Sequence, residues 1–252
     1  MKLGAQMYTL RMYAQNEKDL RFSLKKVSDI GYTEVQLSAI GPIAPEVIKS
    51  ICDEYGLSIV LTHTPADRIL NDTKAVIAEH NLYGCKYIGL GSMPDKYRAP
   101  EWISHFRDDF ADAAKEIADA GKLLMYHNHD FEFEKFDGKL LIDNLLEDFP
   151  ENELGFTLDT FWVQAAGADP VHWIEKLKGR IPCVHLKDMQ MHNRKAVMAP
   201  VLEGNINFER ILDVLSKQGG TEHILVEQDV CLESPFVCLE KSYNNVAKLG
   251  YN

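Results

Sequence analysis

The sequence predicts a single-domain α/β protein whose strands close into a (β/α)8 barrel. Short apolar runs alternate with longer amphipathic stretches along all 252 residues, and no Ser/Gly/Pro-rich linker or compositional break divides them. Strands that are apolar on both faces and alternate with helices form parallel sheets covered by those helices. Eight such units of about 32 residues each match the usual length of a closed barrel. We therefore expect one barrel domain over 1–252, with an open doubly wound sheet as the alternative.

The apolar runs give the expected strands and the amphipathic stretches give the expected helices. Strands are expected over 3–10, 34–40, 58–65, 86–92, 123–130, 154–161, 181–189 and 224–230. Apolar residues at helical spacing predict helices over 20–30, 106–117, 171–177, 208–215 and 237–249. Glycines that follow amphipathic stretches are expected to end helices, namely Gly31, Gly56, Gly84, Gly121 and Gly219.

Composition excludes several classes of protein. The chain has 27 basic and 38 acidic residues, a net charge of −11, so its surface repels phosphate backbones and nucleic acid is not an expected partner. No apolar run approaches the ~20 residues of a membrane span, and no apolar signal segment follows Met1. No GxGxxG motif supports dinucleotide binding. The five cysteines form no CxxC pair, which predicts neither a disulfide framework nor a thiolate zinc site, and favours a cytoplasmic protein.

Polar side chains gather where the expected strands end, which is where barrels of this class carry function. Four of the nine histidines lie there, His63, His127, His129 and His185, and carboxylates lie beside them. Imidazole and carboxylate ligands together suit Mn²⁺, Zn²⁺, Co²⁺ or Fe²⁺, and Mg²⁺ less well. Such an ion binds neighbouring carbonyl and hydroxyl oxygens of a sugar while a carboxylate removes the adjacent proton. The pattern therefore predicts sugar isomerisation or epimerisation.

Five motifs carry a resemblance to a known family. They are YHNHDFEF (126–133), GFTLDTFWV (155–163), VHLKD (184–188), EGNINF (203–208) and LVEQD (225–229). Through them the whole chain resembles the xylose-isomerase-like TIM-barrel superfamily. This group holds sugar and sugar-phosphate isomerases and epimerases, inosose dehydratases and endonuclease IV. The resemblance implies an enzyme with one divalent ion, Mn, Zn, Co or Mg, that acts on a small sugar or sugar derivative.

The resemblance also implies a set of metal ligands. Keto-sugar epimerases of the superfamily hold their ion with Glu, Asp, His and Glu from strands 5 to 8. Asp159, His185 and Glu227 match the last three positions. At the strand-5 position this chain has His127 instead of glutamate, and Glu132 follows where epimerases have a second, substrate-contacting Glu. The fourth ligand is therefore expected to be either His127 or Glu132.

The remaining roles follow from the same resemblance. Glu227 or Glu132 is expected to act as the base, and Lys187 to bind a substrate oxyanion or hydroxyl. His63 and His129 are expected to orient substrate oxygens, with structural roles as the alternative. Trp162 is expected either to form an apolar wall for a sugar or simply to pack.

Several alternatives stay open at this point. An imidazole on strand 5 makes inversion by two glutamates less secure, so elimination from an inosose-type or 3-keto-sugar substrate is the second hypothesis. A non-catalytic sugar-binding barrel is the third, and a phosphodiesterase like endonuclease IV is opposed by the acidic charge. Met189, Met191 and Met198 are expected to mark a lid or subunit contact, or to fill gaps, and a homo-oligomer is compatible with the sequence.

Overall fold

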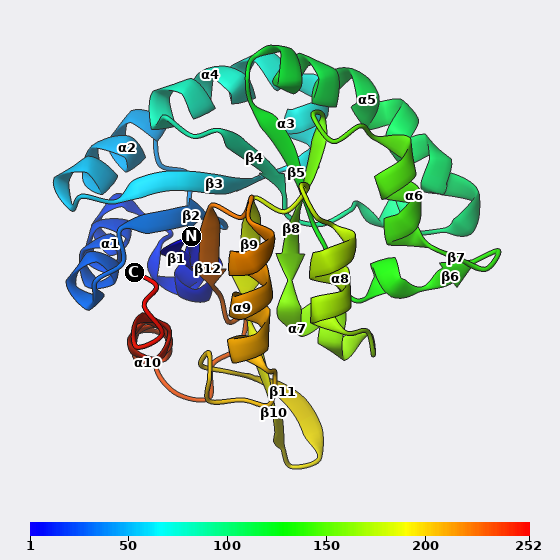
Figure 1. Cartoon of the computed structure of the whole chain (residues 1–252). Coiled ribbons are helices and arrows are strands. Elements are labelled where there is room, and N and C mark those ends of the chain that lie inside the picture. The colour runs from blue at the N-terminus through cyan, green and yellow to red at the C-terminus, as the bar shows by residue number, and fades with distance from the viewer.

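Eight parallel strands form a closed barrel at the centre of the computed structural model, and helices surround it (Figure 1). The structure describes residues 1–252, except for the side chain of Pro100. Around the barrel the strands follow the order β1-β12-β9-β8-β5-β4-β3-β2. The predicted single-domain (β/α)8 fold is therefore confirmed. None of the described helices has both the length and the apolar character that a membrane span needs.

Each of the eight expected strands is present, but all of them end earlier than predicted. The barrel strands are β1 (Lys2–Gln6), β2 (Glu34–Leu37), β3 (Ser58–Thr64), β4 (Tyr87–Leu90), β5 (Leu123–His127), β8 (Leu154–Asp159), β9 (Cys183–Leu186) and β12 (His223–Val226). The first and last runs differ most, by four residues each, and in the first run residues 7–10 were expected in a strand. The Gln6 side chain instead accepts a hydrogen bond from the Tyr8 N–H and begins the 3-10 helix η1 (Met7–Tyr13). Met7 and Leu10 are still buried, whereas Met12 of the same helix is exposed.

Ten α-helices cover the barrel. They are α1 (Glu17–Ile30), α2 (Pro45–Glu54), α3 (Ala66–Asn71), α4 (Thr73–Tyr83), α5 (Ile103–Asp119), α6 (Leu141–Asp148), α7 (Thr160–Ala165), α8 (Pro170–Lys176), α9 (Phe208–Gln218) and α10 (Pro235–Ala247). Short 3-10 helices add η2 (Asp95–Tyr97), η3 (Pro100–Trp102) and η4 (Phe131–Phe133). The five glycines predicted to end helices all have positive φ. Gly84, for example, follows α4 at φ +66°, a conformation that side chains with a Cβ rarely adopt.

The barrel interior is filled at its N-terminal side, which leaves room only toward the C-terminal ends of the strands. Leu61, Tyr87, Met125, Cys183 and Leu225 form a buried cluster there, separate from the larger core between strands and helices. Packing is close enough that a Cβ on Gly155 would lie 2.7 Å from Met125 Sδ. Functional groups are therefore expected at the opposite end of the barrel.

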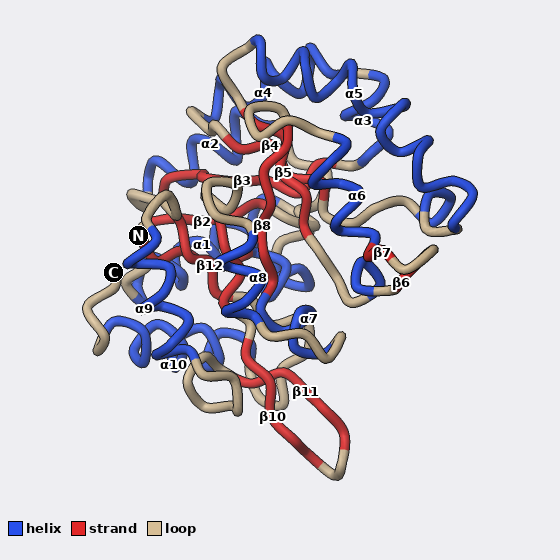
Figure 2. Tube along the Cα trace, turned by 45° about the vertical axis from the view of Figure 1, so that its right-hand side comes forward, coloured by secondary structure: helices blue, strands red, loops and turns tan.

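Two hairpins leave the barrel and were not predicted. The larger, β10 (Asp188–His192) with β11 (Lys195–Ala199), extends away from the barrel beyond β9 (Figure 2). The smaller joins β6 (Lys135–Phe136) to β7 (Lys139–Leu140). Of the hairpin methionines, Met198 is buried and Met191 is 62% exposed, so one fills the base of the hairpin and the other faces solvent. All five cysteines are free thiols, consistent with the expected absence of a disulfide framework.

Candidate functional site

Four buried side chains converge at the C-terminal end of the barrel. His127 ends β5, Asp159 ends β8, His185 lies on β9, and Glu227 follows β12. One ligand atom from each lies within 4.8 Å of the others. The convergence follows from the fold, because β5, β8, β9 and β12 are neighbours in the closed sheet. The structure thus brings together the four residues predicted as metal ligands.

Both histidines of this cluster are oriented by oxygen atoms behind them. His127 Nδ1 lies 2.8 Å from the Gly91 carbonyl, and His185 Nε2 lies 2.6 Å from Gln36 Oε1. These oxygens only accept hydrogen bonds, so each of those ring nitrogens carries the proton. The other nitrogens point into the cluster, with His127 Nε2 3.2 Å from Asp159 Oδ2 and His185 Nδ1 2.9 Å from Glu227 Oε2.

This arrangement fits a divalent cation. In the neutral tautomers, two imidazole lone pairs face two carboxylates, and such a group is stable only with positive charge among its members. Burial alone would lower the pKa of His185, but Glu227 and Asp159 outweigh burial and raise it. The positive charge that the two carboxylates require can come from a proton on His185 or from a metal ion at the centre of the cluster. The cluster can therefore hold a metal ion through His127, Asp159, His185 and Glu227.

Lys187 supplies a second positive charge to the cluster. Its Nζ lies 2.9 Å from Asp159 Oδ2, 3.0 Å from Glu227 Oε2 and 3.0 Å from Asp229 Oδ1. The side chain is 1% exposed, so burial alone would lower its pKa, but the three carboxylates raise it. Burial would also raise the pKa values of Asp159 and Glu227, but Lys187 holds both well below their usual range. The lysine and both of these carboxylates are therefore charged.

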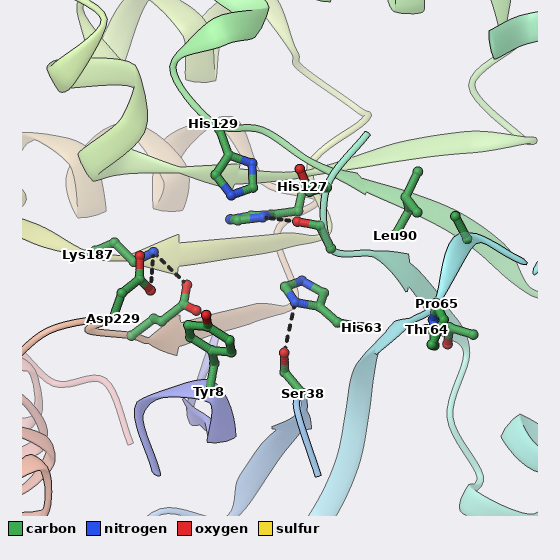
Figure 3. A pocket seen from close by; sticks show the side chains of 14 residues that line it. Tyr8, Ser38, His63, Thr64, Pro65, Leu90, His127, His129, Lys187 and Asp229 are labelled. Atoms are coloured by element: carbon green, nitrogen blue, oxygen red, sulfur yellow. Dashed lines mark hydrogen bonds and ion pairs between the residues drawn. The ribbon is translucent and has the colours of Figure 1, made fainter. Parts of the chain in front are cut away.

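A cavity of about 390 Å³ opens beside the cluster (Figure 3). His63 and His129, the two predicted substrate-orienting histidines, line it together with His127, Lys187 and Glu227. Further lining residues that the sequence did not single out are Tyr8, Ser38, Thr64, Pro65, Ala66, Leu90, Gly91, Ser92 and Asp229. The volume is within the range of small-molecule sites.

His63 and His129 face this cavity as neutral imidazoles. His63 Nδ1 lies 3.1 Å from Ser38 Oγ, while its Nε2 is buried without a partner among the described atoms. His129 Nδ1 is likewise buried and unpartnered within the described side chains. Burial lowers the pKa of His63 well below its usual range and that of His129 to about 3. Each ring therefore has a nitrogen available to a ligand at neutral pH.

Glu132 lies outside the cluster and outside the cavity lining. Its Oε1 accepts a hydrogen bond from the Tyr126 hydroxyl at 2.7 Å, and its Oε2 accepts one from the His129 N–H at 2.8 Å. Burial raises the pKa of this carboxyl to about 7. Of the two alternatives for the fourth ligand, the structure places His127 in the cluster, while Glu132 holds the backbone of His129.

Trp162 packs behind the site. Its ring centre lies 5.3 Å from that of His129 and 5.5 Å from Lys187 Nζ, which is positioned over the ring. Trp162 is not among the residues that line the cavity. Of its two expected roles, the structure therefore favours packing, which holds His129 and Lys187 in place.

Two supporting interactions explain motifs that the sequence showed without assigning a role. Thr160 Oγ1 accepts a hydrogen bond from the Lys187 N–H at 3.1 Å and so fixes the end of β9. The Asp188 carboxylate accepts hydrogen bonds from backbone N–H groups of residues 189, 202, 204 and 206 and anchors the 203–208 loop. A Cβ on Gly204 would lie 2.4 Å from Asp188 Oδ1, which accounts for the glycine.

Comparisons with known proteins agree with the fold. The family model described as xylose isomerase-like TIM barrel matches residues 24–231. An inosose dehydratase from Geobacillus kaustophilus is 26% identical, over 89% of this chain and 84% of the relative. A crystal structure of a sugar phosphate isomerase/epimerase from Parabacteroides distasonis superimposes with a TM-score of 0.83 at 23% identity, covering 97% of this chain and 93% of the other.

A structure of L-ribulose 3-epimerase superimposes with a TM-score of 0.76 at 18% identity, covering 99% of this chain and 94% of the other. The names of these relatives describe enzymes of two reaction classes, isomerisation and dehydration. The family model spans most of the chain, including His127, Asp159, His185 and Glu227. The protein belongs to the xylose isomerase-like TIM barrel family.

Proposed function

We propose that this protein is a divalent-metal-dependent enzyme that moves a proton next to the carbonyl of a sugar, as an isomerase or epimerase. The observation that carries the proposal is the convergence of two oriented imidazoles and two carboxylates beside a cavity with two neutral histidines. His127, Asp159, His185 and Glu227 would hold the ion. When bound, it polarises a carbonyl and stabilises the negative charge that develops when the adjacent proton leaves.

The side chains of the cavity supply the remaining steps. Glu227 is ionised and lines the cavity, so it is the carboxylate that accepts the proton. The Lys187 ammonium lies in the same lining and is positioned to donate to a substrate oxygen that gains negative charge. His63 and His129, both neutral, donate to or accept from substrate hydroxyls through their unpartnered nitrogens.

Elimination is the second candidate reaction, and the position of Glu132 favours it. Inversion at a carbon by two carboxylates needs one on each face of the substrate. The carboxylates that line the cavity, Glu227 and Asp229, both follow β12, whereas Glu132 is bonded to Tyr126 and His129. His63 and His129 are imidazoles in the same lining. A single carboxylate that removes the proton and passes it to a leaving hydroxyl on the same face, which departs as water, is sufficient for β-elimination, and the neutral imidazoles donate hydrogen bonds to substrate oxygens. The relative named inosose dehydratase is consistent with this reaction.

Deuterium wash-in tests the proposal. The chain is incubated in D₂O with Mn²⁺ and a panel of ketoses and inososes, and the substrates are analysed by NMR and mass spectrometry. We expect deuterium at a carbon next to the carbonyl. An inverted or rearranged sugar identifies epimerisation or isomerisation, and an ultraviolet-absorbing enone that has lost water identifies elimination.

Two results would contradict the proposal. Absence of exchange into every candidate while the ion is bound would refute proton transfer. Tight sugar binding that a chelator leaves unchanged, without turnover, would instead indicate a sugar-binding barrel.

A further inference from the structure

A second cavity, of about 480 Å³, adjoins the candidate active site. Ser38, His63, Thr64 and Pro65 line both cavities, so the two share a border. Figure 3 shows Thr64 and Pro65 on the far side of His63 from Lys187. A molecule seated at the metal-ligand cluster can therefore extend past His63 into the second cavity, which we call the side groove.

One wall of the side groove is aliphatic and aromatic, and the polar part of its lining is contributed by Ser38, Thr62, His63, Thr64, Arg68 and Glu79. Leu37, Ile40, Ile43, Pro45, Ile48 and Tyr83 contribute to the apolar wall from the end of β2, the 38–44 loop, α2 and α4. Leu37, Ile48 and Tyr83 are buried, but Ile40 and Ile43 are only partly covered. Partly exposed isoleucines that face a cavity give an apolar ligand surface to bury.

The loop that forms this wall is held in place before any ligand binds. The Gln15 amide donates a hydrogen bond to the Ala39 carbonyl at 2.8 Å, and the Gly41 N–H donates one to the Ala14 carbonyl at 3.0 Å. Ala39 has φ +52°, a left-handed conformation that is costly for a residue with a Cβ. Because the backbone of this loop is already fixed, ligand binding carries no entropy cost for ordering it.

The charges of the two cavities select against a phosphate group. Among the described lining residues, the first cavity has one lysine or arginine, which is Lys187. The side groove also has one, which is Arg68. Lys187 already contacts three carboxylates. Arg68 Nη2 lies 2.9 Å from Glu79 Oε2, and Glu79 lines the same groove. A phosphate would have to displace a carboxylate partner or lie beside one.

We propose that the substrate is an uncharged sugar derivative with an apolar substituent, and not a sugar phosphate. The sugar occupies the cavity beside the metal-ligand cluster, and the substituent occupies the side groove. This assignment rests on the proposed function for the position of the sugar.

Binding of simple glycosides tests the assignment without turnover. Titration calorimetry of the full chain with Mn²⁺ compares phenyl glucopyranosides of both anomers with the methyl glucopyranosides, and glucose 6-phosphate with glucose. We expect one phenyl glycoside to bind about tenfold more tightly than its methyl counterpart, because the ring buries apolar area. Glucose 6-phosphate should bind no more tightly than glucose.

A negative charge introduced into the side groove tests whether the groove is the source of the phenyl preference. Ile43→Glu, and independently Ile40→Glu, should abolish the phenyl preference, measured as the ratio of phenyl to methyl glycoside affinity. Leu82→Glu is the matched control, because Leu82 is 40% exposed on α4 and is not a lining residue of the groove. Thermal melts establish that each variant is folded.

Three outcomes would overturn the assignment: no phenyl preference, including the case in which neither glycoside binds; a preference that both Ile variants retain; or tighter binding of glucose 6-phosphate. The outcome is separable from that of the proposed function. A protein that shows the phenyl preference but no deuterium wash-in would support the side-groove assignment and contradict the proposed reaction.

Discussion

The two ends of the barrel each contain a buried glutamate against a histidine. At the N-terminal end Glu34 Oε2 lies 2.6 Å from His223 Nδ1, and Lys2 Nζ lies 3.6 Å from Glu34 Oε1. At the C-terminal end Glu227 Oε2 lies 2.9 Å from His185 Nδ1, with Lys187 3.0 Å away. The same three residue types are therefore used at both ends.

The surroundings of the two groups differ. The Glu34 group is packed against the filled interior, with the Tyr87 ring 5.9 Å from that of His223, and its lysine is 69% exposed. The Glu227 group shares its lysine with Asp159 and Asp229 and lies beside a cavity. A Glu–His pair by itself indicates only a satisfied buried contact. Convergence of several such groups, with unpartnered nitrogens on nearby histidines, indicates a site for a ligand.

Matched glutamine variants should separate the two ends most clearly. Glu227→Gln removes a candidate ligand and base, so we expect a loss of about a thousandfold in kcat or more. Glu34→Gln should lower the Tm and leave kcat unchanged, because it weakens contacts at the closed end. Steady-state kinetics and thermal melts measure both. Equal activity losses in the two variants would remove the functional distinction between the ends.

Matched lysine variants give the next largest effect. Lys187→Met leaves Asp159, Glu227 and Asp229 together without their cation, so the metal-free protein should lose about 3–5 kcal/mol of unfolding free energy. Saturating Mn²⁺ should restore part of this loss, because the ion binds the folded state. Lys2→Met should lower the unfolding free energy by no more than about 1 kcal/mol, because the Lys2 side chain in the ion pair with Glu34 is 69% exposed. Urea unfolding measures both, and similar losses would contradict the comparison.

His80, which belongs to neither of the two glutamate–histidine groups, should make the unfolding free energy depend on pH. Buried His80 lies with Nδ1 2.8 Å from the Val76 carbonyl and Nε2 2.8 Å from Thr62 Oγ1, and burial lowers its pKa to about 4. In the unfolded chain it takes up a proton near its ordinary pKa of 6.5. Its contribution is therefore present above that pH and is lost as the pH falls toward 4.

The expected size of the His80 effect is about 3 kcal/mol of unfolding free energy between pH 7 and pH 4. Urea unfolding at the two pH values measures it. His80→Leu should show a shallower pH dependence than the unchanged chain. Identical slopes in the two proteins would mean that His80 does not carry this contribution.

The smallest expected effect concerns Glu132. Because its carboxyl holds Tyr126 and the backbone of His129 and does not line the cavity, Glu132→Gln should lower kcat by less than about tenfold, or 1.4 kcal/mol. Kinetics with a folded variant measures it. A loss approaching that of Glu227→Gln would give Glu132 the direct role expected from the sequence.

The barrel itself was predictable because all eight strands and five of the ten α-helices follow local patterns in the sequence. Apolar runs of the right length gave eight strands, and glycines such as Gly84 and Gly121 marked helix ends through their positive φ. The hairpin from Asp188 to Ala199 was missed because only its base is buried, so its strands leave no continuous apolar run. The end of the first strand at Gln6 was missed because Met7 and Leu10 are apolar residues that would be buried in a strand and are also buried in the 3-10 helix.

The candidate site was predictable in part because its residues end strands. The strand ends placed His127, Asp159, His185 and Glu227 at one end of the barrel, and the family resemblance implied that they bind a metal. The choice between His127 and Glu132 needed side-chain geometry. Supporting groups such as Gln36 and Asp229 act through the direction and partners of their side chains, which a residue type does not reveal. The side groove depends on the loop conformation around Ala39 and was not visible in the sequence.

Divalent-ion stoichiometry tests the central claim most directly. Mn²⁺ binding to the metal-stripped chain is measured by calorimetry and by metal analysis after dialysis, for the unchanged protein and for Asp159→Asn and Glu34→Gln. We expect one ion per chain in the unchanged protein and in Glu34→Gln, and affinity weaker by about a hundredfold or more in Asp159→Asn. Failure of the unchanged chain to bind an ion, or equal affinity in Asp159→Asn, would contradict a metal centre at the C-terminal end of this barrel.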